Sequence, residues 1–350
     1  MCQKRASLEC LDLPQAGGSA VKCGRMATIS DALLHVQAKG HLRPFDHNRD
    51  LLPVADLVEV SFDDNIDADG QRYLRQMRDA AHNPNFLRWA NAVVDQASLP
   101  LSGFVWEEAG RLVGNLSLIP FQLNGQRNYL VANVAVHPDF RRRGIGRALT
   151  AAAIEYARKR GAASTWLHVR QENDVAIQLY LSLGFTEHTR RSTWHAPANQ
   201  PDPYAGNRSY QVIPRRKDHW PQQEAWLSRL YPPEVAWHFP LNLNHFRTDL
   251  IGLFYRIISG ASWRHWAIQS NGKLEGIVSW RPSFGHYSQI WLAIPFEYKG
   301  LVVESLLVYA VNKVSAARPI ALDFPARVAD DAIRAAGFSI HQTLIWMVTS

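Results

Sequence analysis

The chain has 350 residues, of which 47% are hydrophobic and 20% charged, and its formal net charge is +7 with an isoelectric point near 9.4. This composition is that of a globular protein and excludes a largely disordered chain, while the length favours two domains of roughly 150 residues each. The positive charge favours anionic partners such as phosphates, CoA-like cofactors or nucleic acid, although it also serves solubility alone.

Residues 1–38 are expected to form a disordered tail. They contain all three cysteines, Cys2, Cys10 and Cys23, so a disulfide framework is excluded for the rest of the chain. The spacing of the cysteines matches no zinc site, and we expect no bound metal. No run of residues approaches the about 18 apolar residues of a membrane helix, and the opening lacks the apolar core of a signal peptide. We therefore expect a soluble cytoplasmic protein with no membrane partner.

The first half of the chain shows helical and strand periodicities in turn. Its predicted elements are a strand at 40–45, helices at 50–62 and 72–97, strands at 102–107, 112–120 and 128–136, a helix capped by Gly161, a strand at 164–169, a helix at 173–183 and a strand at 186–194. Strands and helices are mixed along the chain, so residues 39–196 are predicted to form one mixed α+β domain.

Prolines and polar residues at 197–207 predict a linker, after which the pattern of the first half begins again. A strand is predicted at 209–213 and a helix at 219–230. The segment 111–117 recurs at 273–279, and Leu183-Gly-Phe185 recurs as Ala336-Gly-Phe338, at a shift that falls from 162 to 153 residues. A tandem duplication explains this repetition, so residues 208–350 are predicted to form a second domain of the same kind.

A basic, glycine-punctuated turn lies between the strand at 128–136 and the helix after it. Gly144 and Gly146 can take backbone angles that side chains forbid, so successive N–H groups can turn toward one anion at the start of the helix. Four arginines supply matching positive charge, namely Arg141, Arg142, Arg143 and Arg147. The turn therefore predicts a phosphate-binding cradle.

Two familiar nucleotide motifs are excluded at this turn. A dinucleotide fingerprint would need a third glycine where Leu149 stands and an acidic residue about 20 positions on, where Trp166, Leu167 and His168 occur. A P-loop would need Gly-Lys followed by Ser or Thr, which is also missing. The sequence therefore disfavours a nicotinamide site and an ATP site.

The turn instead resembles the central motif of the GNAT superfamily of acyl-CoA N-acyltransferases, Arg/Gln-x-x-Gly-x-Gly/Ala after a strand. Here the motif is Arg141-Arg-Arg-Gly144-Ile-Gly146, preceded by a Val-His-Pro-Asp-Phe run. A second family segment is similar to the stretch from Asn173 to Phe185, with Tyr180 at its tyrosine position. The resemblance covers about residues 40–196 well and the second half in outline. It implies two tandem GNAT-like domains, each a mixed, mostly antiparallel central sheet flanked by helices.

The resemblance also implies which residues bind the cosubstrate acetyl-CoA. The backbone of Val134, Ala135 and Val136 would bind the pantetheine arm. The amides from Arg142 to Arg147, including those of Gly144, Ile145 and Gly146, would bind the pyrophosphate beside Arg141. Asn173 would contact the cofactor, and the Tyr180 hydroxyl would approach its sulfur. Spacing supports this independently, because Asn173 and Tyr180 are two helical turns apart and share one face.

In such enzymes an amine attacks the thioester directly and the thiolate leaves. Tyr180, with an ordinary pKa near 10, stays protonated at neutral pH and is a candidate general acid for the thiolate. The identity of the general base that takes the proton of the amine is left open. Many relatives have a glutamate on the strand where this chain reads Leu130-Val-Ala-Asn133. Glu107 and Glu108 are candidate replacements, and His137 and Glu172 are further ones.

The second half lacks the corresponding residues. Aligning Gly300 with Gly144 puts Val302 at Gly146 and Glu297 at Arg141, while Ile333 falls where Tyr180 stands. We therefore expect a degenerate domain that binds no acyl-CoA. The leading hypothesis is an N-acetyltransferase with an acceptor amine that the sequence does not identify. The alternative is a non-catalytic acyl-CoA-binding regulatory module. The basic clusters are scattered and accompany no nucleic-acid motif, so no nucleic-acid partner is expected.

Overall fold

The computed structural model describes residues 39–62, 68–82, 102–197, 210–239, 241–250, 252, 255, 263–281, 287–314 and 318–350. The predicted tail at 1–38, the end of the predicted helix beyond His82 and most of the predicted linker lie outside these residues. Within them, no helix is both long and apolar enough to cross a membrane.

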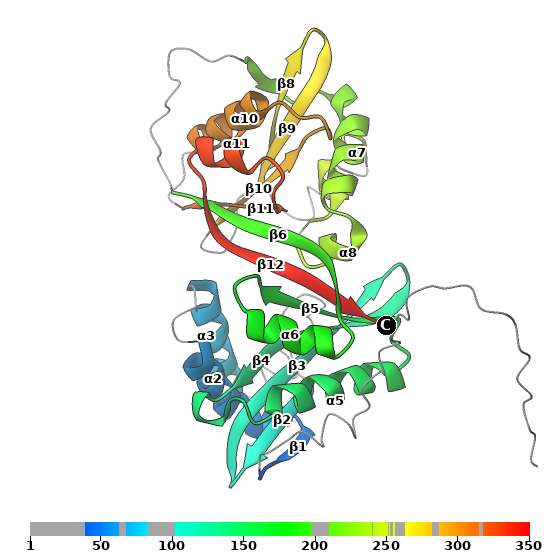
Figure 1. Ribbon diagram of the computed structural model, residues 1–350. Coiled ribbons are helices and arrows are strands. Elements are labelled where there is room, and N and C mark those ends of the chain that lie inside the picture. Colours follow the sequence, from blue (N-terminus) through cyan, green and yellow to red (C-terminus); the bar gives the residue numbers. More distant parts are fainter. Residues whose placement is uncertain are drawn as a thin grey trace, which may run out of the picture.

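Twelve strands form one continuous sheet that runs through both halves of the protein (Figure 1). The strand order is β1-β2-β3-β4-β5-β12-β6-β11-β10-β9-β8-β7. Helices flank the sheet in each half, and most neighbouring strands are antiparallel, except that β4 pairs with β5 and β10 with β11 in parallel. The predicted fold class, two tandem mixed α/β halves with mostly antiparallel sheets, is confirmed.

The elements of the first half follow the predicted order. They are β1 (His41–Pro44), α2 (His47–Phe62), α3 (Ala68–His82), β2 (Gly103–Glu108), β3 (Arg111–Leu123), β4 (Gln126–Val136), the 3₁₀ helix η2 (Pro138–Phe140), α5 (Ile145–Lys159), β5 (Ser164–Arg170), α6 (Asp174–Ser182) and β6 (Thr186–Ala196). Gly161 follows the end of α5 with a φ of +68°, as expected of a residue that ends a helix in the left-handed conformation.

The second half repeats this order with shorter helices around its last strands. Its elements are β7 (Val212–Pro214), η3 (Lys217–His219), α7 (Trp220–Leu230), α8 (Pro233–Ala236), η4 (Leu243–Phe246), β8 (Arg264–Ser270), β9 (Lys273–Arg281), β10 (Ser288–Ala293), α10 (Gly300–Lys313), β11 (Ile320–Pro325), α11 (Asp330–Ala335) and β12 (Ser339–Thr349).

The two halves exchange their last strands. β6 ends the first half in sequence but pairs with β11 of the second half, while β12 pairs with β5 of the first half. β6 and β12 also pair with each other, and Figure 1 shows them crossing together between the two lobes. Backbone hydrogen bonds therefore join the halves into one sheet. The predicted boundary at 197–207 stays a prediction, because 198–209 lie outside the described residues.

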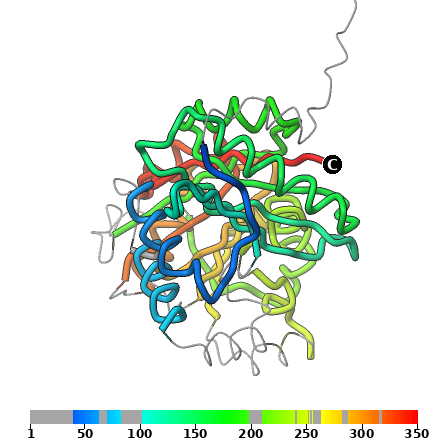
Figure 2. The backbone as a smooth tube through the Cα atoms, turned by 90° about the horizontal axis from the view of Figure 1, so that it is seen from below, coloured from blue at the N-terminus to red at the C-terminus, as the bar shows by residue number. Residues whose placement is uncertain are grey.

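Separate apolar clusters cover the two faces of the first half. α5 and α6 pack on one face, in a cluster that contains Leu149, Leu167 and Tyr180 and also Ile345 and Met347 from the exchanged strand β12. α2 and α3 pack together on the other face, where their cluster includes Ala135 of β4. Figure 2 shows these two helices, coloured blue to cyan, next to each other. The sheet thus has an α5–α6 face and an α2–α3 face, and both names are used below.

One part of the predicted alignment between the halves is wrong by one residue. A Cβ on Gly114 of β3 would lie 2.8 Å from Ile145 of α5, and a Cβ on Gly276 of β9 would lie 3.4 Å from Val302 of α10. Both glycines let a helix approach the sheet closely, so Val302 takes the place of Ile145 rather than that of Gly146. The repeat itself stands, because each half has the same strand–turn–helix unit.

Candidate functional site

The two parallel strands β4 and β5 separate at the centre of the first half. They pair only from Asn128 with Ser164 to Val131 with Leu167. Beyond this point β4 carries a bulge, where the register with β3 shifts and Asn133 adopts a φ of +50°. The bulge bends the strand, so Ala132–Val134 are half-buried although β4 lies inside the sheet. The separation leaves backbone groups of β4 that β5 does not bind.

The predicted cradle follows directly at the end of β4. Arg142 and Gly144 have φ values of +64° and +83°, and Gly144 is the N-cap of α5. Among the described residues, no backbone carbonyl accepts a hydrogen bond from the amides of residues 142–147, and the first such bond into the helix is that of Ala148 to Gly144. Six successive N–H groups at a helix start can therefore bind an anion.

The arginine side chains of the turn are largely bound by the protein itself. Arg141 donates to the carbonyls of Val136 and Ser61, at 3.2 and 3.0 Å. Arg143 donates to the carbonyl of Asp139 at 3.1 Å. Arg147 donates to Ser182 Oγ at 2.9 Å and so joins α5 to α6. These contacts hold the turn in shape, and the exposed Arg142 side chain and the backbone amides remain as donors for a ligand.

α6 presents the other two predicted cofactor residues. Asn173 is the N-cap of this helix, and its Oδ1 accepts a hydrogen bond from the amide of Ala176 at 3.1 Å. Tyr180 is 6% exposed within the cluster on the α5–α6 face. Burial raises the pKa of Tyr180 to about 12, so its hydroxyl keeps its proton at neutral pH.

The glutamates considered as bases lie at the end of β2 and are bound by arginines. Glu107 accepts hydrogen bonds from Arg43, at 2.9 Å, and from Arg49. The Arg43 and Arg49 guanidinium groups lower the pKa of Glu107, which makes it a weaker base. Glu108 lies 3.5 Å from Arg143. Glu172 is exposed, and His137 accepts a hydrogen bond from the amide of Asp139.

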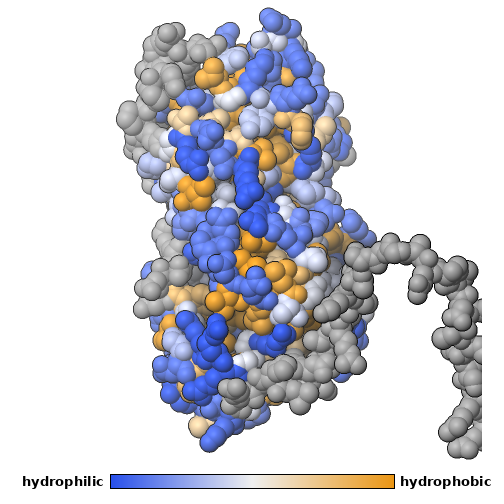
Figure 3. Space-filling model, viewed as in Figure 1, coloured by the Kyte–Doolittle hydropathy of each residue, from blue (hydrophilic) through white to orange (hydrophobic). Residues whose placement is uncertain are grey.

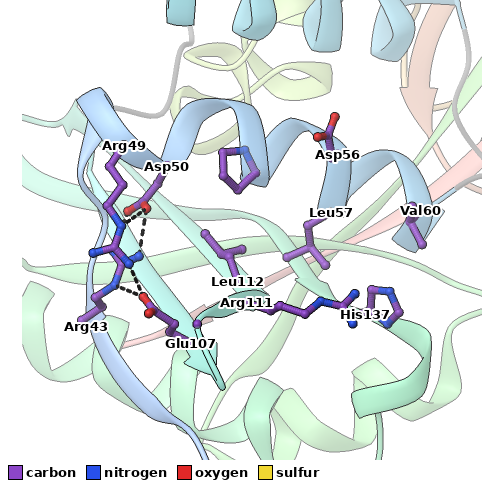
Figure 4. A pocket seen from close by; sticks show the side chains of 12 residues that line it. Arg43, Arg49, Asp50, Asp56, Leu57, Val60, Glu107, Arg111, Leu112 and His137 are labelled. Atoms are coloured by element: carbon purple, nitrogen blue, oxygen red, sulfur yellow. Dashed lines mark hydrogen bonds and ion pairs between the residues drawn. The ribbon is translucent and has the colours of Figure 1, made fainter.

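A cavity of about 380 Å³ lies beside Glu107, between α2, the β2–β3 hairpin and His137 (Figure 4). Its floor is apolar, and the ion pairs of Arg43 with Asp50 and Glu107 form one end. Arg111 and His137 lie at the other end in Figure 4. The cavity is on the side of α2, so it is separate from the row of amides at α5.

Two polar residues near the separation of β4 and β5, Asn133 and His168, were not predicted as site residues. Asn133 Nδ2 donates to the Tyr73 hydroxyl on α3 at 2.8 Å. His168 on β5 is the first residue after the parallel pairing, and its Nε2 is buried without a hydrogen-bond partner in the described part of the chain. His238 of the second half lies against it, with ring centroids 4.6 Å apart. Burial lowers the pKa of both histidines. No local pattern joins these residues, so the sequence offered no signal.

The exposed surface of α6 is partly apolar. Val175 and Leu181 are 64% and 44% exposed. Figure 3 shows hydrophobic surface in this region of the lower lobe. No cluster of three or more metal-ligating side chains occurs in the described residues.

The sequence of the first half matches a known family model. Residues 64–185 match the model described as the acetyltransferase (GNAT) family. A relative in Escherichia coli, named ribosomal protein bS18-alanine N-acetyltransferase, is 51% identical over 63 residues, which are 18% of this chain and 43% of the relative. A mycothiol acetyltransferase from Thermobispora bispora is 40% identical over 93 residues, 26% of this chain and 32% of the relative. The chain therefore spans less than half the length of these curated relatives.

The fold is similar to a solved structure over nearly its whole length. A GCN5-related N-acetyltransferase from Sphaerobacter thermophilus superposes with a TM-score of 0.58 at 14% sequence identity, covering 90% of this chain and 96% of the other. At this identity the likeness concerns the fold alone. Across both halves the chain has the fold of that GCN5-related N-acetyltransferase, and its residues 64–185 match the acetyltransferase (GNAT) family.

Proposed function

We propose that the first half is an N-acetyltransferase that moves the acetyl group of acetyl-CoA to an amine. One observation carries the proposal. Six consecutive amides, at residues 142–147, bind no backbone carbonyl of the described residues at the start of α5, and they follow the point where β4 leaves β5. A cofactor with a pyrophosphate and a long, hydrogen-bonding arm fits a row of amides followed by an unpaired strand edge.

The residues would divide the binding between them. The amides of Arg142–Arg147 would hold the pyrophosphate at the helix start. The backbone of Val134–Val136 would bind the pantetheine arm, because this stretch of β4 has no partner in β5. Asn173 caps α6, and the bond from Arg147 to Ser182 holds this helix beside α5. Tyr180 lies on the α5–α6 face, where the thioester would follow the arm.

The chemical step needs one attack and one protonation. The amine nitrogen attacks the thioester carbonyl, a C–N bond forms and the C–S bond breaks. Tyr180 donates its proton to the leaving sulfur, which gives the free thiol of CoA. The amide product loses the extra proton of its nitrogen through water, and Tyr180 regains one. The raised pKa of Tyr180 keeps the hydroxyl protonated when the thiolate leaves, so a proton is present to be donated, although the shift also makes the hydroxyl a weaker acid.

The second half is proposed to bind no acetyl-CoA. The turn before α10 has no residue with positive φ between positions 294 and 301, so its amides cannot converge in the same way. Tyr298 of this turn accepts a hydrogen bond from the amide of Ala329 at 3.0 Å. Lys299, the N-cap, is paired with Glu275 at 2.7 Å. These internal contacts occupy the turn with the protein's own groups, which supports one acetyl-CoA site per chain.

The acceptor is proposed to be a primary amine. The name of the Escherichia coli relative gives an alanine of ribosomal protein bS18 as its acceptor. The name of the other relative points to mycothiol. A peptide with an amino-terminal alanine and a small amine are therefore both included in the test.

Calorimetry with acetyl-CoA tests the cofactor site, and release of free thiol in the presence of amines tests the transfer. We expect one acetyl-CoA per chain and thiol release with at least one class of amine. The amines are an alanine peptide, a lysine peptide and a small polyamine. A protein that binds no acetyl-CoA contradicts the proposal. Tight binding without thiol release from any amine supports the regulatory module instead.

A further inference from the structure

Asn133 is held on two sides at the bulge of β4. Its backbone carbonyl accepts a hydrogen bond from Asn115 Nδ2 at 3.0 Å, and its side-chain Nδ2 donates to the Tyr73 hydroxyl at 2.8 Å. Asn115 is 1% exposed, so the contact on the β3 side is fully buried. The left-handed φ of +50° at Asn133 is therefore fixed by β3 and α3 together. A side chain held this firmly keeps a defined direction.

The amide of Asn133 lies on the α2–α3 face of the sheet. Its partner Tyr73 belongs to α3, and the nearby Ala135 packs in the cluster of α2 and α3. Val134 and Val136 instead pack on the α5–α6 face with Tyr180. The cradle and Tyr180 are thus on one face, and Asn133 with Tyr73 is on the other. An acceptor that approaches from the α2–α3 face reaches the separation of the strands without crossing the cofactor side.

Two polar atoms at the bulge of β4, Asn133 Oδ1 and the Tyr73 hydroxyl, can each make a further hydrogen bond. Among the described residues, Asn133 Oδ1 has no hydrogen-bond partner, and the Tyr73 hydroxyl accepts from Asn133 without donating to any group. Burial raises the pKa of Tyr73, so the hydroxyl keeps its proton. Asn133 therefore offers a free acceptor atom next to the donor O–H of Tyr73. Asn133 itself is half-buried, so the position can be reached.

We propose that Asn133 Oδ1 binds the N–H of the acceptor amine and that Tyr73 is a positioning residue that orients Asn133. This inference rests on the proposed function and adds the binding site of the second substrate, the acceptor amine. A side-chain amide accepts a hydrogen bond but takes up no proton near neutral pH. The ammonium therefore gives its proton to water before it is held, and the neutral nitrogen attacks the thioester carbonyl. At this position the chain orients the amine instead of deprotonating it.

Among the described residues, the carboxylates of α2 and the histidine of β5 near Asn133 are poor candidates for a base. On α2, Asp50 pairs with Arg43, while Asp56 and Glu59 pair with Arg78 of α3. Burial lowers the pKa of His168 on β5 well below its ordinary value, so this ring binds a proton weakly and is a poor base for an ammonium group. The other charged or titratable groups on α3 and β5 whose side chains the structure describes are Arg72, Arg75, Asp79, His82 and Arg170.

The pH dependence of the reaction distinguishes an oriented amine from a deprotonated one. If the enzyme supplies no base, kcat/KM for the amine rises tenfold per pH unit up to the pKa of the amine itself. The rise should then end near pH 8 for an α-amino group with a pKa of about 8 and continue to about pH 10 for a lysine side chain. A common inflection for both amines, below either pKa, would show a protein base and overturn the inference.

Variants of the pair provide the second arm of the test. We expect Asn133→Gly, which keeps the positive φ without strain, to raise the KM for the amine about tenfold with acetyl-CoA affinity unchanged within about twofold. Tyr73→Phe should raise this KM about threefold and have no further effect in the Asn133→Gly background, because it acts through Asn133. Asn133→Asp should shift the rise of kcat/KM to lower pH, since a carboxylate can take the proton.

Asn128→Ala is the matched control, because Asn128 is a buried asparagine on the same strand outside the separation, bonded to Ser164. It should lower thermal stability and leave the amine KM unchanged. An active protein whose amine KM is unaffected by Asn133→Gly overturns this inference and leaves the proposed function intact. A wild-type protein that binds no acetyl-CoA refutes the proposed function, and the inference falls with it.

Discussion

Arg191 on β6 and Asp323 on β11 form an ion pair inside the seam of exchanged strands, with Arg191 Nε 2.5 Å from Asp323 Oδ1. The Arg191 side chain is 2% exposed, and its Nη1 also donates to the carbonyl of Leu230 at 2.9 Å. Tyr231 lies beneath the guanidinium, 4.9 Å from ring centroid to Arg191 Cζ, and donates its hydroxyl to the carbonyl of Asp323. The buried positive charge of Arg191 in the first half is thus neutralised by Asp323 of the second half.

Replacing Arg191 with Met should destabilise the protein by about 3–5 kcal/mol, because Asp323 would remain as a buried charge without a partner. Urea denaturation measures the loss. The double variant Arg191→Met/Asp323→Leu should recover most of it, since it removes both charges and keeps the volume. Equal destabilisation of the single and double variants would show that the unpaired charge of Asp323 is not the cause of the loss.

His238 and His168 predict an acid-sensitive fold. Burial lowers the pKa of His238 from 6.5 to about 4, so the unfolded chain binds a proton in this range that the folded protein does not. The stability that His238 contributes is complete above pH 6.5. It is lost progressively as the pH falls from 6.5, the pKa in the unfolded chain, to about 4, the pKa in the folded protein, by about 3 kcal/mol in all. His168 acts in the same direction.

Asp323 has the opposite effect in the same range, because burial raises its pKa to about 6. The effect of His238 is therefore measured by comparing the pH dependence of the unfolding free energy between the wild type and His238→Gln. Urea denaturation from pH 4 to pH 7 should show a smaller dependence of the unfolding free energy on pH in the variant. An identical slope in both proteins would mean that His238 is not buried as a neutral ring.

Gly144→Ala should weaken acetyl-CoA binding about tenfold. The φ of +83° at Gly144 is strained for alanine, and relaxing it would turn the amides of the cradle away from one another. Calorimetry measures the affinity. Gly125→Ala is the matched control, since Gly125 has a φ of +74° in the β3–β4 hairpin and open space at its Cβ position. It should lower stability similarly and leave the affinity unchanged. Equal affinity in the two variants would contradict the role of the cradle.

The sequence predicted the parts of the site that depend on local residues. Gly144 has the positive φ expected of it, whereas Gly146 lies within α5 and has none, and the other positive φ of the turn falls on Arg142. Helical spacing places Leu149, Ala153 and Ala157 on one side of α5, where they pack in one cluster. These features need no knowledge of distant contacts.

The exchange of strands was beyond sequence reasoning. β6 and β12 each end their own half, and nothing local in either strand decides whether it pairs with β5 or with β11. The choice depends on contacts such as that of Arg191 with Asp323, which are 132 positions apart. For the same reason the arginine partners of Glu107 and the contact of Asn133 with Tyr73, 60 positions away, had no local signal.

Tyr180→Phe should lower kcat about 100-fold and leave the affinity for acetyl-CoA within about twofold, because the ring still fills its place beside Phe185 while the proton for the thiolate is lost. Tyr156→Phe is the control, since Tyr156 lies half-buried on α5 and its ring contacts Phe104 and Tyr129. It should retain full activity. In the wild type, a pKa of Tyr180 near 12 means that deprotonation of this residue causes no fall in kcat up to about pH 10. Thiol release measured from pH 6 to pH 10 with both variants tests all three expectations. Unchanged kcat in Tyr180→Phe would show that water protonates the thiolate and that Tyr180 only packs in the core.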